Sequence, residues 1–369
     1  MNNKKYITAI LIAVQITLML PFTSHASNEL NLSAKSAALY EPNGKEFLYE
    51  KNANQRLGMA STTKIMTALI ALESLDLDQE IAVDDRAIGI DGSSIYLEQD
   101  EIMTAEDLIY SLMLRSANDA AEALAYEIAG SIEAFCEIMN ERANLLGLKD
   151  TNFKNPHGLD AKDHYTTAHD LAIISAEALN NPKFKEISST YKKVVESNFQ
   201  TRTLVNHNKL LKMYEGCIGV KTGYTQACGR SLVGAAERDG LMLVSVTIDA
   251  PNDWADHKKL LDLGFSTVKS IKLLDAEELS YRLPVINGAP EEITVTNKDR
   301  LRIIYKGDLP EIKREILLPR YITNSVKSGD CVGKVIFRIN GDIVAQTELI
   351  TKESSFIKKK KGFFERIFK

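Results

Sequence analysis

The spacing of apolar residues places two predicted hairpins on either side of a helical region. Residues 37–40 and 46–49 flank a Pro-Asn-Gly turn, and residues 230–237 and 241–248 flank Asp-Gly, so each pair predicts a β-hairpin. Strands at both ends of a helical segment favour one antiparallel sheet, built from both ends of that segment, with helices packed on it.

The region between the hairpins carries apolar positions at helical spacing. Residues 61–72 are apolar on most faces, which is typical of a buried helix. Thr104 and Thr167 each stand three residues before an aspartate, as helix N-caps do, and Pro182 ends the helix that follows the second cap. Further helices are predicted for residues 119–128 and 132–146.

From about residue 272 the pattern changes to short alternating strands separated by turn residues. This region holds no plausible set of catalytic residues. It therefore predicts a small all-β domain with a packing or positioning role. Its strands are expected at residues 293–296, 301–305, 335–339 and 343–349.

The last segment, residues 352–369, has the pattern of an amphipathic helix. Six large apolar residues fall within an arc of about 140° on a helical wheel, and cations lie opposite. Such a helix lies in a membrane interface, so residues 354–369 are expected to attach the protein to a membrane. A disordered basic tail is the alternative. The apolar residues are Phe356, Ile357, Phe363, Phe364, Ile367 and Phe368.

Residues 1–26 have the features of a secretory signal peptide. Lys4 and Lys5 precede an apolar stretch that is short for a membrane span, and Ser24-His25-Ala26 places small residues where a signal peptidase cleaves. An uncleaved N-terminal anchor is the alternative. We expect an exported protein.

Composition narrows the class of protein. Hydrophobic residues make up 44% and charged residues 26%, which indicates a globular chain, and its length suits two domains. The net charge of −5 argues against a general nucleic-acid binder. Four scattered cysteines favour free thiols, although a bridge between Cys217 and Cys228 stays open. No histidine cluster has ligand spacing, so we expect neither a metal nor another cofactor.

Three short strings carry the chemistry. A Ser-x-x-Lys string begins at Ser61, Ser-Ala-Asn begins at Ser116, and Lys-Thr-Gly begins at Lys221. Each is weak alone, and Ser-x-x-Lys occurs four times in the chain. In this order, at a helix start, at a break between helices and on a predicted strand, they indicate acyl transfer through a serine ester.

Ser61 is the candidate nucleophile and Lys64 its base. Positions three apart share a helix face, so the amine would lie beside the hydroxyl. Lys64 accepts a proton only when neutral, which burial and a nearby cation favour. Backbone N–H groups at the helix start, that of Ser61 among them, would form an oxyanion hole. Taken alone, Ser61 would be an ordinary helix cap.

The other two strings supply the remaining groups. Ser116 would relay a proton between the lysine base and the leaving amine, and Asn118 would hold the substrate or orient that lysine. Lys221 adds positive potential and Thr222 would bind a substrate carboxylate. Gly223 lets an extended peptide approach the strand edge.

The ordered strings, with the signal peptide, the small β-domain and the basic tail, resemble the low-molecular-mass penicillin-binding proteins of D-alanyl-D-alanine carboxypeptidase type over nearly the whole chain. The resemblance implies an α+β fold in which helices flank an antiparallel sheet with an inserted helical region, as in β-lactamases and DD-peptidases. Three further strings fit the family: Asn155-Pro-His-Gly-Leu159, Asn206-His-Asn-Lys-Leu210 and residues 219–225.

The resemblance also implies a function. Ser61 would be acylated by the penultimate D-alanine of a peptidoglycan stem peptide, the terminal D-alanine would leave, and water would hydrolyse the ester. β-Lactams would acylate the same serine as covalent inhibitors. The enzyme would work on the outer face of the bacterial cytoplasmic membrane. The expected organisation is a signal peptide (1–26), a catalytic domain (27–272), an all-β domain (273–351) and an anchor (352–369).

One departure from the family concerns the substrate carboxylate. Some members bind it through an arginine shortly after the strand that follows Lys-Thr-Gly. Residues 247–258 occupy that stretch here and hold no arginine. Thr222 and Thr225 are therefore the candidates for this contact.

The sequence leaves three alternative functions. A class A-like β-lactamase needs a Glu-x-x-x-Asn loop, and the nearest string, from Glu177 to Asn180, is one residue short and falls in a predicted helix. A D,D-endopeptidase would use the same chemistry with another leaving group. A catalytically inactive wall-binding protein would have no need of Lys64.

Overall fold

The computed structural model describes residues 30–357. The predicted signal peptide lies outside the described residues, and so does most of the predicted anchor, residues 358–369. Within the described residues, no helix is both long enough and apolar enough to cross a membrane.

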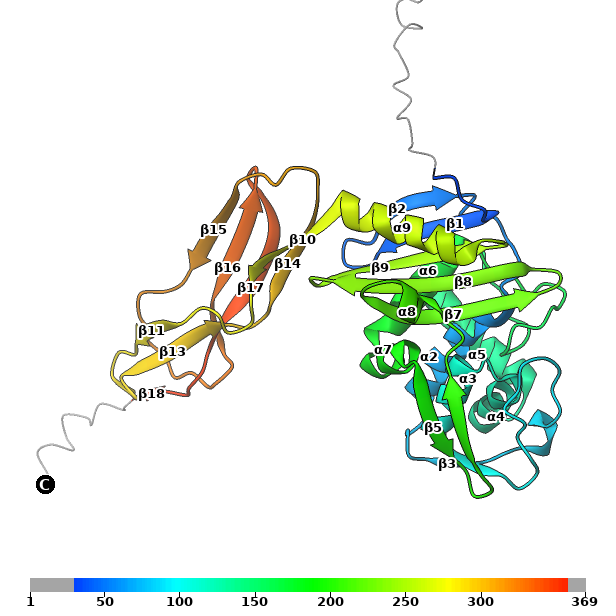
Figure 1. Ribbon diagram of the computed structural model, residues 1–369. Helices are drawn as coiled ribbons and strands as arrows, with labels where there is room; N and C mark the ends of the chain where they lie inside the picture. Colours follow the sequence, from blue (N-terminus) through cyan, green and yellow to red (C-terminus); the bar gives the residue numbers. More distant parts are fainter. Residues whose placement is uncertain (1–29, 358–369) are drawn as a thin grey trace, which may run out of the picture. The chain divides into compact units, whose positions relative to one another are not determined.

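The first part of the chain is built on a five-stranded antiparallel sheet (Figure 1). Both predicted hairpins are confirmed, and β1 pairs with β9, so the two ends of the segment share one sheet. Every residue of β1 is buried, because helices cover both faces of the sheet. The strand order is β2 (Glu46–Lys51), β1 (Ser36–Glu41), β9 (Leu241–Ile248), β8 (Gly229–Arg238) and β7 (Cys217–Thr225).

Helices pack on the two faces of this sheet. Figure 1 shows α9 (Asp253–Thr267) on one face and α6 (Ala168–Asn180) on the other. α2 (Lys64–Ser74) follows a short 3-10 turn, η1 (Ala60–Thr63), and its first eight residues are buried, as the all-round apolar pattern predicts. The remaining helices are η2 (Asp85–Ala87), α3 (Ala105–Leu114), α4 (Asn118–Ala129), α5 (Ile132–Leu145), α7 (Pro182–Ser189) and α8 (Leu210–Met213).

The predicted capping signals are confirmed. The hydroxyl of Thr104 accepts a hydrogen bond from the N–H of Asp107 at the start of α3, and Thr167 caps α6 in the same way. α6 ends at Asn180, and Asn181 caps α7, whose first residue is Pro182. Two small sheets complete this part: β3 (Glu80–Ala82) with β4 (Ile102–Thr104), and β5 (Lys192–Glu196) with β6 (Thr201–Val205).

Residues from β10 onward form the predicted all-β part, with its own core around Leu283, Val295 and Phe337. The strands predicted from the alternating pattern are confirmed as β13, β14, β16 and β17. The elements are β10 (Val268–Leu274), β11 (Tyr281–Pro284), β12 (Gly288–Ala289), β13 (Glu292–Asn297), β14 (Leu301–Lys306), β15 (Ile312–Leu317), β16 (Cys331–Ile339), β17 (Asp342–Thr351) and β18 (Phe356–Ile357).

The structure differs from the expected C-terminal helix at its beginning. Phe356 and Ile357 are strand residues that pair with Ala289 and Gly288. The helical-wheel pattern of these two residues is local, whereas the partner strand that satisfies their backbone lies about 70 residues earlier in the chain. Residues 358–369 lie outside the described residues, so the rest of the predicted helix stays a prediction.

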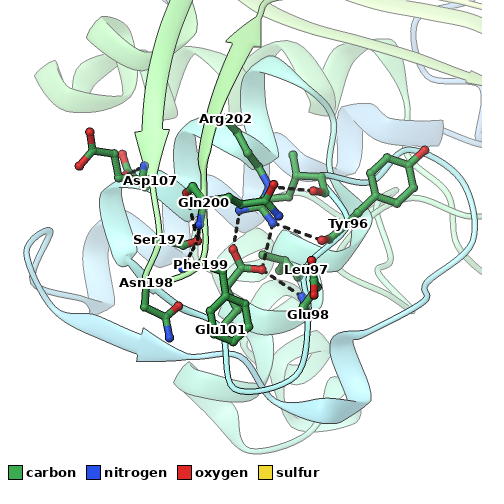
Figure 2. A network of polar contacts seen from close by, with 12 residues as sticks. Tyr96, Leu97, Glu98, Glu101, Asp107, Ser197, Asn198, Phe199, Gln200 and Arg202 are labelled. Atoms are coloured by element: carbon green, nitrogen blue, oxygen red, sulfur yellow. Dashed lines mark hydrogen bonds and ion pairs between the residues drawn. The ribbon is translucent and has the colours of Figure 1, made fainter.

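One buried ion pair fastens a loop to the β5–β6 hairpin (Figure 2). The carboxylate of Glu101 is fully buried and accepts hydrogen bonds at 2.5 and 3.0 Å from Arg202 of β6. The same guanidinium donates to the backbone carbonyls of Ile95 and Tyr96. Arg202 thereby fixes the loop of residues 95–101, because it satisfies both a buried charge and two backbone acceptors.

Replacing Arg202 should therefore destabilise the protein. Arg202→Met leaves the Glu101 carboxylate buried without its cation, so we expect the free energy of unfolding to fall by about 3 kcal/mol in chemical denaturation. The double variant Glu101→Gln/Arg202→Met removes both charges and should recover a large part of that loss. A single variant within about 0.5 kcal/mol of the wild type would contradict this assignment.

Candidate active site

The three strings predicted to carry chemistry come together beside Lys221 and Gly223 of β7. Ser61 lies in η1 and Lys64 is the first residue of α2, with Nζ of Lys64 3.1 Å from Oγ of Ser61. Ser116 precedes α4, and Lys221 of β7 reaches it with Nζ 3.0 Å from Oγ. Residues more than 100 positions apart thus form one polar cluster.

The hydrogen-bond partners of Lys64 determine which way the N–H groups and the lone pair of its neutral amine point. Its fully buried amine lies 2.7 Å from Oδ1 of Asn118 and 2.6 Å from the carbonyl oxygen of His157. Both of these groups only accept hydrogen bonds. A neutral amine has two N–H groups and one lone pair, so its lone pair must face the remaining partner, the hydroxyl of Ser61. This is the geometry that the predicted roles of Lys64 as base and Ser61 as nucleophile require.

The environment favours the neutral form of Lys64. Burial first, and the charge of Lys221 second, lower the pKa of Lys64 well below that of an ordinary lysine, while Asp119 opposes this shift. No carboxylate accepts a hydrogen bond from this amine in the described part of the chain. An adjacent ion pair would have held the proton on the lysine.

The carbonyl that binds Lys64 comes from the Asn155-Pro-His-Gly-Leu string. Oδ1 of Asn155 accepts the N–H of Gly158, and its amide donates to Leu159, which closes a tight turn. Gly158 has φ +92°, and a Cβ there would lie 1.9 Å from the carbonyl oxygen of Ala60. The glycine therefore lets this turn pack directly against η1, which brings its neighbour His157 to the lysine.

Asn118 links the base to the loop before it. Its N–H donates to the carbonyl of Ser93 at 2.7 Å, and its side-chain amide donates to the carbonyl of Asp91 at 2.5 Å. The amide oxygen is thereby turned toward Lys64. Ser116, two residues earlier, adopts φ +61°, an unfavourable conformation for a serine that is held by the break between α3 and α4.

Lys221 is the second buried cation. Only 2% of the residue is exposed, and burial lowers its pKa to about 7. Its amine donates to Oγ of Ser116 and to the carbonyl of Thr222. Since Oγ of Ser116 accepts this hydrogen bond, its own proton is available to a group in the cleft.

Gly223 lets β7 lie against η1, the short turn that carries Ser61. A Cβ at this position would lie 3.0 Å from the backbone nitrogen of Ser61 and 3.2 Å from that of Thr62. β7 is also the edge strand of its sheet, so one side of its backbone is free of a neighbouring strand. The backbone nitrogen of Ser61, near the start of a helical turn, therefore lies beside the edge strand of the sheet.

These groups open into a cleft of about 820 Å³. Ser61, Ser116, Thr222 and Gly223 line it, as expected from the strings. Lys64, Asn118 and Lys221 lie behind this surface, fully or almost fully buried. The cleft is large enough for the end of a peptide.

Thr225 is placed differently from the other predicted residues. Its hydroxyl donates to Oδ1 of Asp160 at 2.8 Å and accepts the N–H of Cys228, and it is not among the residues that line the cleft. The other candidate for a carboxylate contact, Thr222, does line the cleft.

Sequence reasoning missed several residues of the cleft. Ser93, Tyr191, His207, Arg230 and Trp254 line it from separate loops and elements. Arg230 follows Lys-Thr-Gly closely in the sequence and lies in the next strand, β8, whereas the family's arginine is expected within residues 247–258. His207 lies within a string that fits the family, which was the only signal for it.

Cysteines and possible metal ligands add nothing to the site. All four thiols, including those of Cys217 and Cys228, are free, so the bridge left open by the sequence is not formed. Among residues 30–357, no three side chains of His, Cys, Asp or Glu are grouped as a metal site would require.

Comparison with known protein families gives two matches. A family model described as D-alanyl-D-alanine carboxypeptidase (Peptidase_S11) matches residues 23–252. A model described as Penicillin-binding protein 5, C-terminal domain, matches residues 269–355. The two matches together cover most of the chain.

Individual relatives are similar over nearly their whole length. The chain is 33% identical over 376 residues to D-alanyl-D-alanine carboxypeptidase DacF of Bacillus subtilis, which covers 98% of this chain and 96% of that protein. It is 32% identical over 367 residues to DacC of Escherichia coli, covering 92% of this chain and 87% of the relative.

Solved structures share the architecture. Penicillin-binding protein 5 from Haemophilus influenzae has a TM-score of 0.65 at 28% identity, covering 88% of this chain and 98% of that structure. The Streptomyces K15 DD-transpeptidase has a TM-score of 0.61 at 30% identity, covering 64% of this chain and 98% of that structure. The predicted α+β fold is confirmed, and the chain belongs to the serine-type D-alanyl-D-alanine carboxypeptidase family.

Proposed function

We propose that this protein removes the terminal D-alanine from peptidoglycan stem peptides through an acyl-enzyme on Ser61. The observation that carries the proposal is the set of contacts around Lys64. Two carbonyl oxygens accept from its amine, so the neutral form has its lone pair left for the Ser61 hydroxyl. Membership of the family supports the substrate class.

The reaction follows from the positions of these groups. Nζ of Lys64 takes the proton of Ser61, and Oγ attacks the carbonyl carbon of the penultimate D-alanine. The N–H of Ser61 stabilises the negative oxygen that forms. The C–N bond then breaks, and the leaving amine takes a proton from Ser116, which is replenished from the cluster. Water attacks the ester, the acid product leaves, and Ser61 recovers its proton.

Three substrate-side groups complete the proposed site. The edge of β7 at Gly223 would pair with the extended peptide, and Asn118 would contact its backbone amide as well as Lys64. Lys221 holds Ser116 and adds positive potential to a cleft that receives an anionic chain end. β-Lactams, whose amide carbonyl is strained, would acylate Ser61 by the same first step and leave slowly.

The alternatives are less well supported. A class A-like β-lactamase would need a glutamate at the acyl-enzyme, but Glu177 lies within α6 and its carboxylate pairs with Arg142. Burial of a lysine without a counter-charge is unfavourable, and an inactive binding protein would have no use for such a residue. A D,D-endopeptidase would share each step and differ only in the leaving group.

We also propose how the enzyme reaches its substrate. Residues 1–26 would direct export, residues 27–272 would form the catalytic domain and residues 273–351 the all-β domain. The basic amphipathic segment within residues 352–369 would bind the outer face of the cytoplasmic membrane. The enzyme would then work beside the membrane where new wall is made.

The assignment of nucleophile and base is tested by covalent labelling. Ser61→Ala should lose all labelling by a fluorescent penicillin, and Lys64→Ala should slow acylation by about 10²–10⁴-fold because no base remains at Oγ. Mass spectrometry of the digested adduct should place the label on Ser61. Label that persists in the alanine variant would show another nucleophile.

The pH dependence of acylation reports on Lys64. Because the neutral amine is the base, the rate should rise with pH along a limb whose midpoint lies well below 10.5, the ordinary pKa of lysine. Lys221→Ala removes a positive charge that lowers the pKa of Lys64, so this limb should move to higher pH. The exposed Lys149→Ala is the matched control and should leave the midpoint unchanged. A shift to lower pH in Lys221→Ala would refute this assignment.

Removal of residues 358–369 tests the anchor. This deletion spares β18, so the described fold is kept. The truncated protein should stay in the supernatant when sedimented with anionic lipid vesicles, while the complete chain pellets, and both should cleave a D-Ala-D-Ala peptide equally. Equal sedimentation of the two proteins would exclude the tail as the anchor.

A further inference from the structure

The proposed function requires a cation for the end of the substrate. A stem peptide ends in a free carboxylate. An anion that enters a cleft loses part of its hydration, which is unfavourable unless a positive group takes the place of the water. The expected threonines offer hydroxyls only, and Thr225 already donates its hydrogen to Asp160. The stretch 247–258, where some family members have the arginine, holds none.

Arg230 lies where such a cation is needed. It is the second residue of β8 and stands directly opposite Tyr224 of β7. Opposite residues of an antiparallel pair share a face, and so do residues two apart on a strand, so Arg230 lies on the same face as Thr222. Arg230 and Thr222 line the same cleft as the nucleophile Ser61.

A buried carboxylate fixes one edge of this guanidinium. Nε and Nη2 of Arg230 each lie 3.0 Å from Oδ2 of Asp253, the first residue of α9. The Asp253 side chain is 3% exposed, and its Oδ1 accepts the N–H of Trp254. The indole ring of Trp254 lies 6.0 Å from Cζ of Arg230. The cation is therefore oriented before any substrate arrives.

The other edge of the guanidinium remains free for a ligand. The Arg230 side chain is 44% exposed, and Nη1 makes no hydrogen bond to the residues that the structure describes. An arginine has five N–H donors in a planar fork, so it can bind a second carboxylate while the first stays in place.

The other cations of the cleft are less suitable. Lys64 and Lys221 are buried and bind Ser61 and Ser116. Nζ of Lys212 lies over the ring of Tyr191, 3.6 Å from its centroid. Lys209 lines the cleft, but its flexible four-carbon side chain makes no hydrogen bond or ion pair to residues 30–357. Arg230 combines exposure, fixed direction and unused donors.

We propose that Arg230, oriented by Asp253, binds the terminal carboxylate of the substrate beside the hydroxyl of Thr222, and binds the ring carboxylate of β-lactams in the same place. This inference rests on the proposed function and names the specificity-determining residue of that site. The cation comes from β8 rather than from the stretch after β9, and Asp253 is a positioning residue.

The test compares two substrates. For a peptide that ends in D-Ala-D-Ala, Arg230→Ala should reduce kcat/KM by about 10- to 100-fold, because a charge-assisted contact is lost. For the same peptide with a C-terminal amide, the variant and the wild type should differ by less than about threefold. Equal losses on both substrates would mean that Arg230 is merely structural and would overturn the proposal.

Two further measurements sharpen the result. Guanidinium chloride at tens of millimolar should restore part of the activity of Arg230→Ala on the free acid, while sodium chloride at the same concentration should not. Arg238→Ala removes an arginine from the other end of β8, where it donates to the carbonyl of Glu215, and serves as the matched control that keeps wild-type kcat/KM. Failure of guanidinium to restore any activity would count against the subsite.

Failure of this proposal can be told apart from failure of the proposed function. Prolonged incubation with excess penicillin should label Ser61 of both the wild type and Arg230→Ala, which also shows that the variant is folded. A wild type that is never labelled would refute the acyl-enzyme itself. A labelled Arg230→Ala that keeps full kcat/KM on the free acid would refute only the carboxylate subsite.

Discussion

The structure depends on one constraint, which is the burial of the Lys64 amine without a carboxylate beside it. Two carbonyl oxygens take its N–H groups, so the lone pair of the neutral amine is left for Ser61. Burial of an unpaired lysine opposes folding, because water solvates the charged form far better than the interior does. The rest of the catalytic part keeps this arrangement in place: the turn at Gly158 presents one carbonyl, and the loop at Asp91 and Ser93 holds the amide of Asn118 that presents the other.

Carboxylates near the cleft make their hydrogen bonds to the scaffold and none to the amine of Lys64. The side chain of Asp119 accepts from Ser94 and from the N–H groups of Ile95 and Leu97, and Glu101 is held by Arg202 (Figure 2). Both contacts fasten the same loop. Asp253, which also lines the cleft, holds Arg230 in a comparable way. Local donors satisfy these carboxylates, so the cleft keeps the charge of Lys221 and the free edge of the Arg230 guanidinium for an anionic peptide end.

The relation between the two buried lysines illustrates how one fold combines stability with chemistry. Burial lowers the pKa of both lysines, and the charge of Lys221 further disfavours a proton on Lys64. The stability contribution of these lysines depends on pH in the opposite way from that of a lysine whose pKa is raised by a salt bridge. A lysine with a lowered pKa in the folded state binds fewer protons than it does in the unfolded chain, so its contribution becomes more favourable as pH rises from the folded pKa to about 10.5.

The sequence by itself determined the elements and the list of chemical groups. Hairpin turns, helix caps at Thr104 and Thr167 and the buried pattern of α2 are local signals, because they arise from residues within a few positions of one another. The ordered strings named Ser61, Lys64, Ser116 and Lys221 for the same reason.

Only the tertiary structure decided which groups meet. Lys64 and His157 are separated by 93 positions in the sequence, Arg202 and Glu101 by 101, and Arg230 and Asp253 by 23, yet each pair is in contact. Pairing of Phe356 with Ala289 likewise overrides a helical pattern. Such contacts depend on how strands and helices pack, and the spacing of residues along a chain carries no record of which distant backbone or side chain will satisfy them.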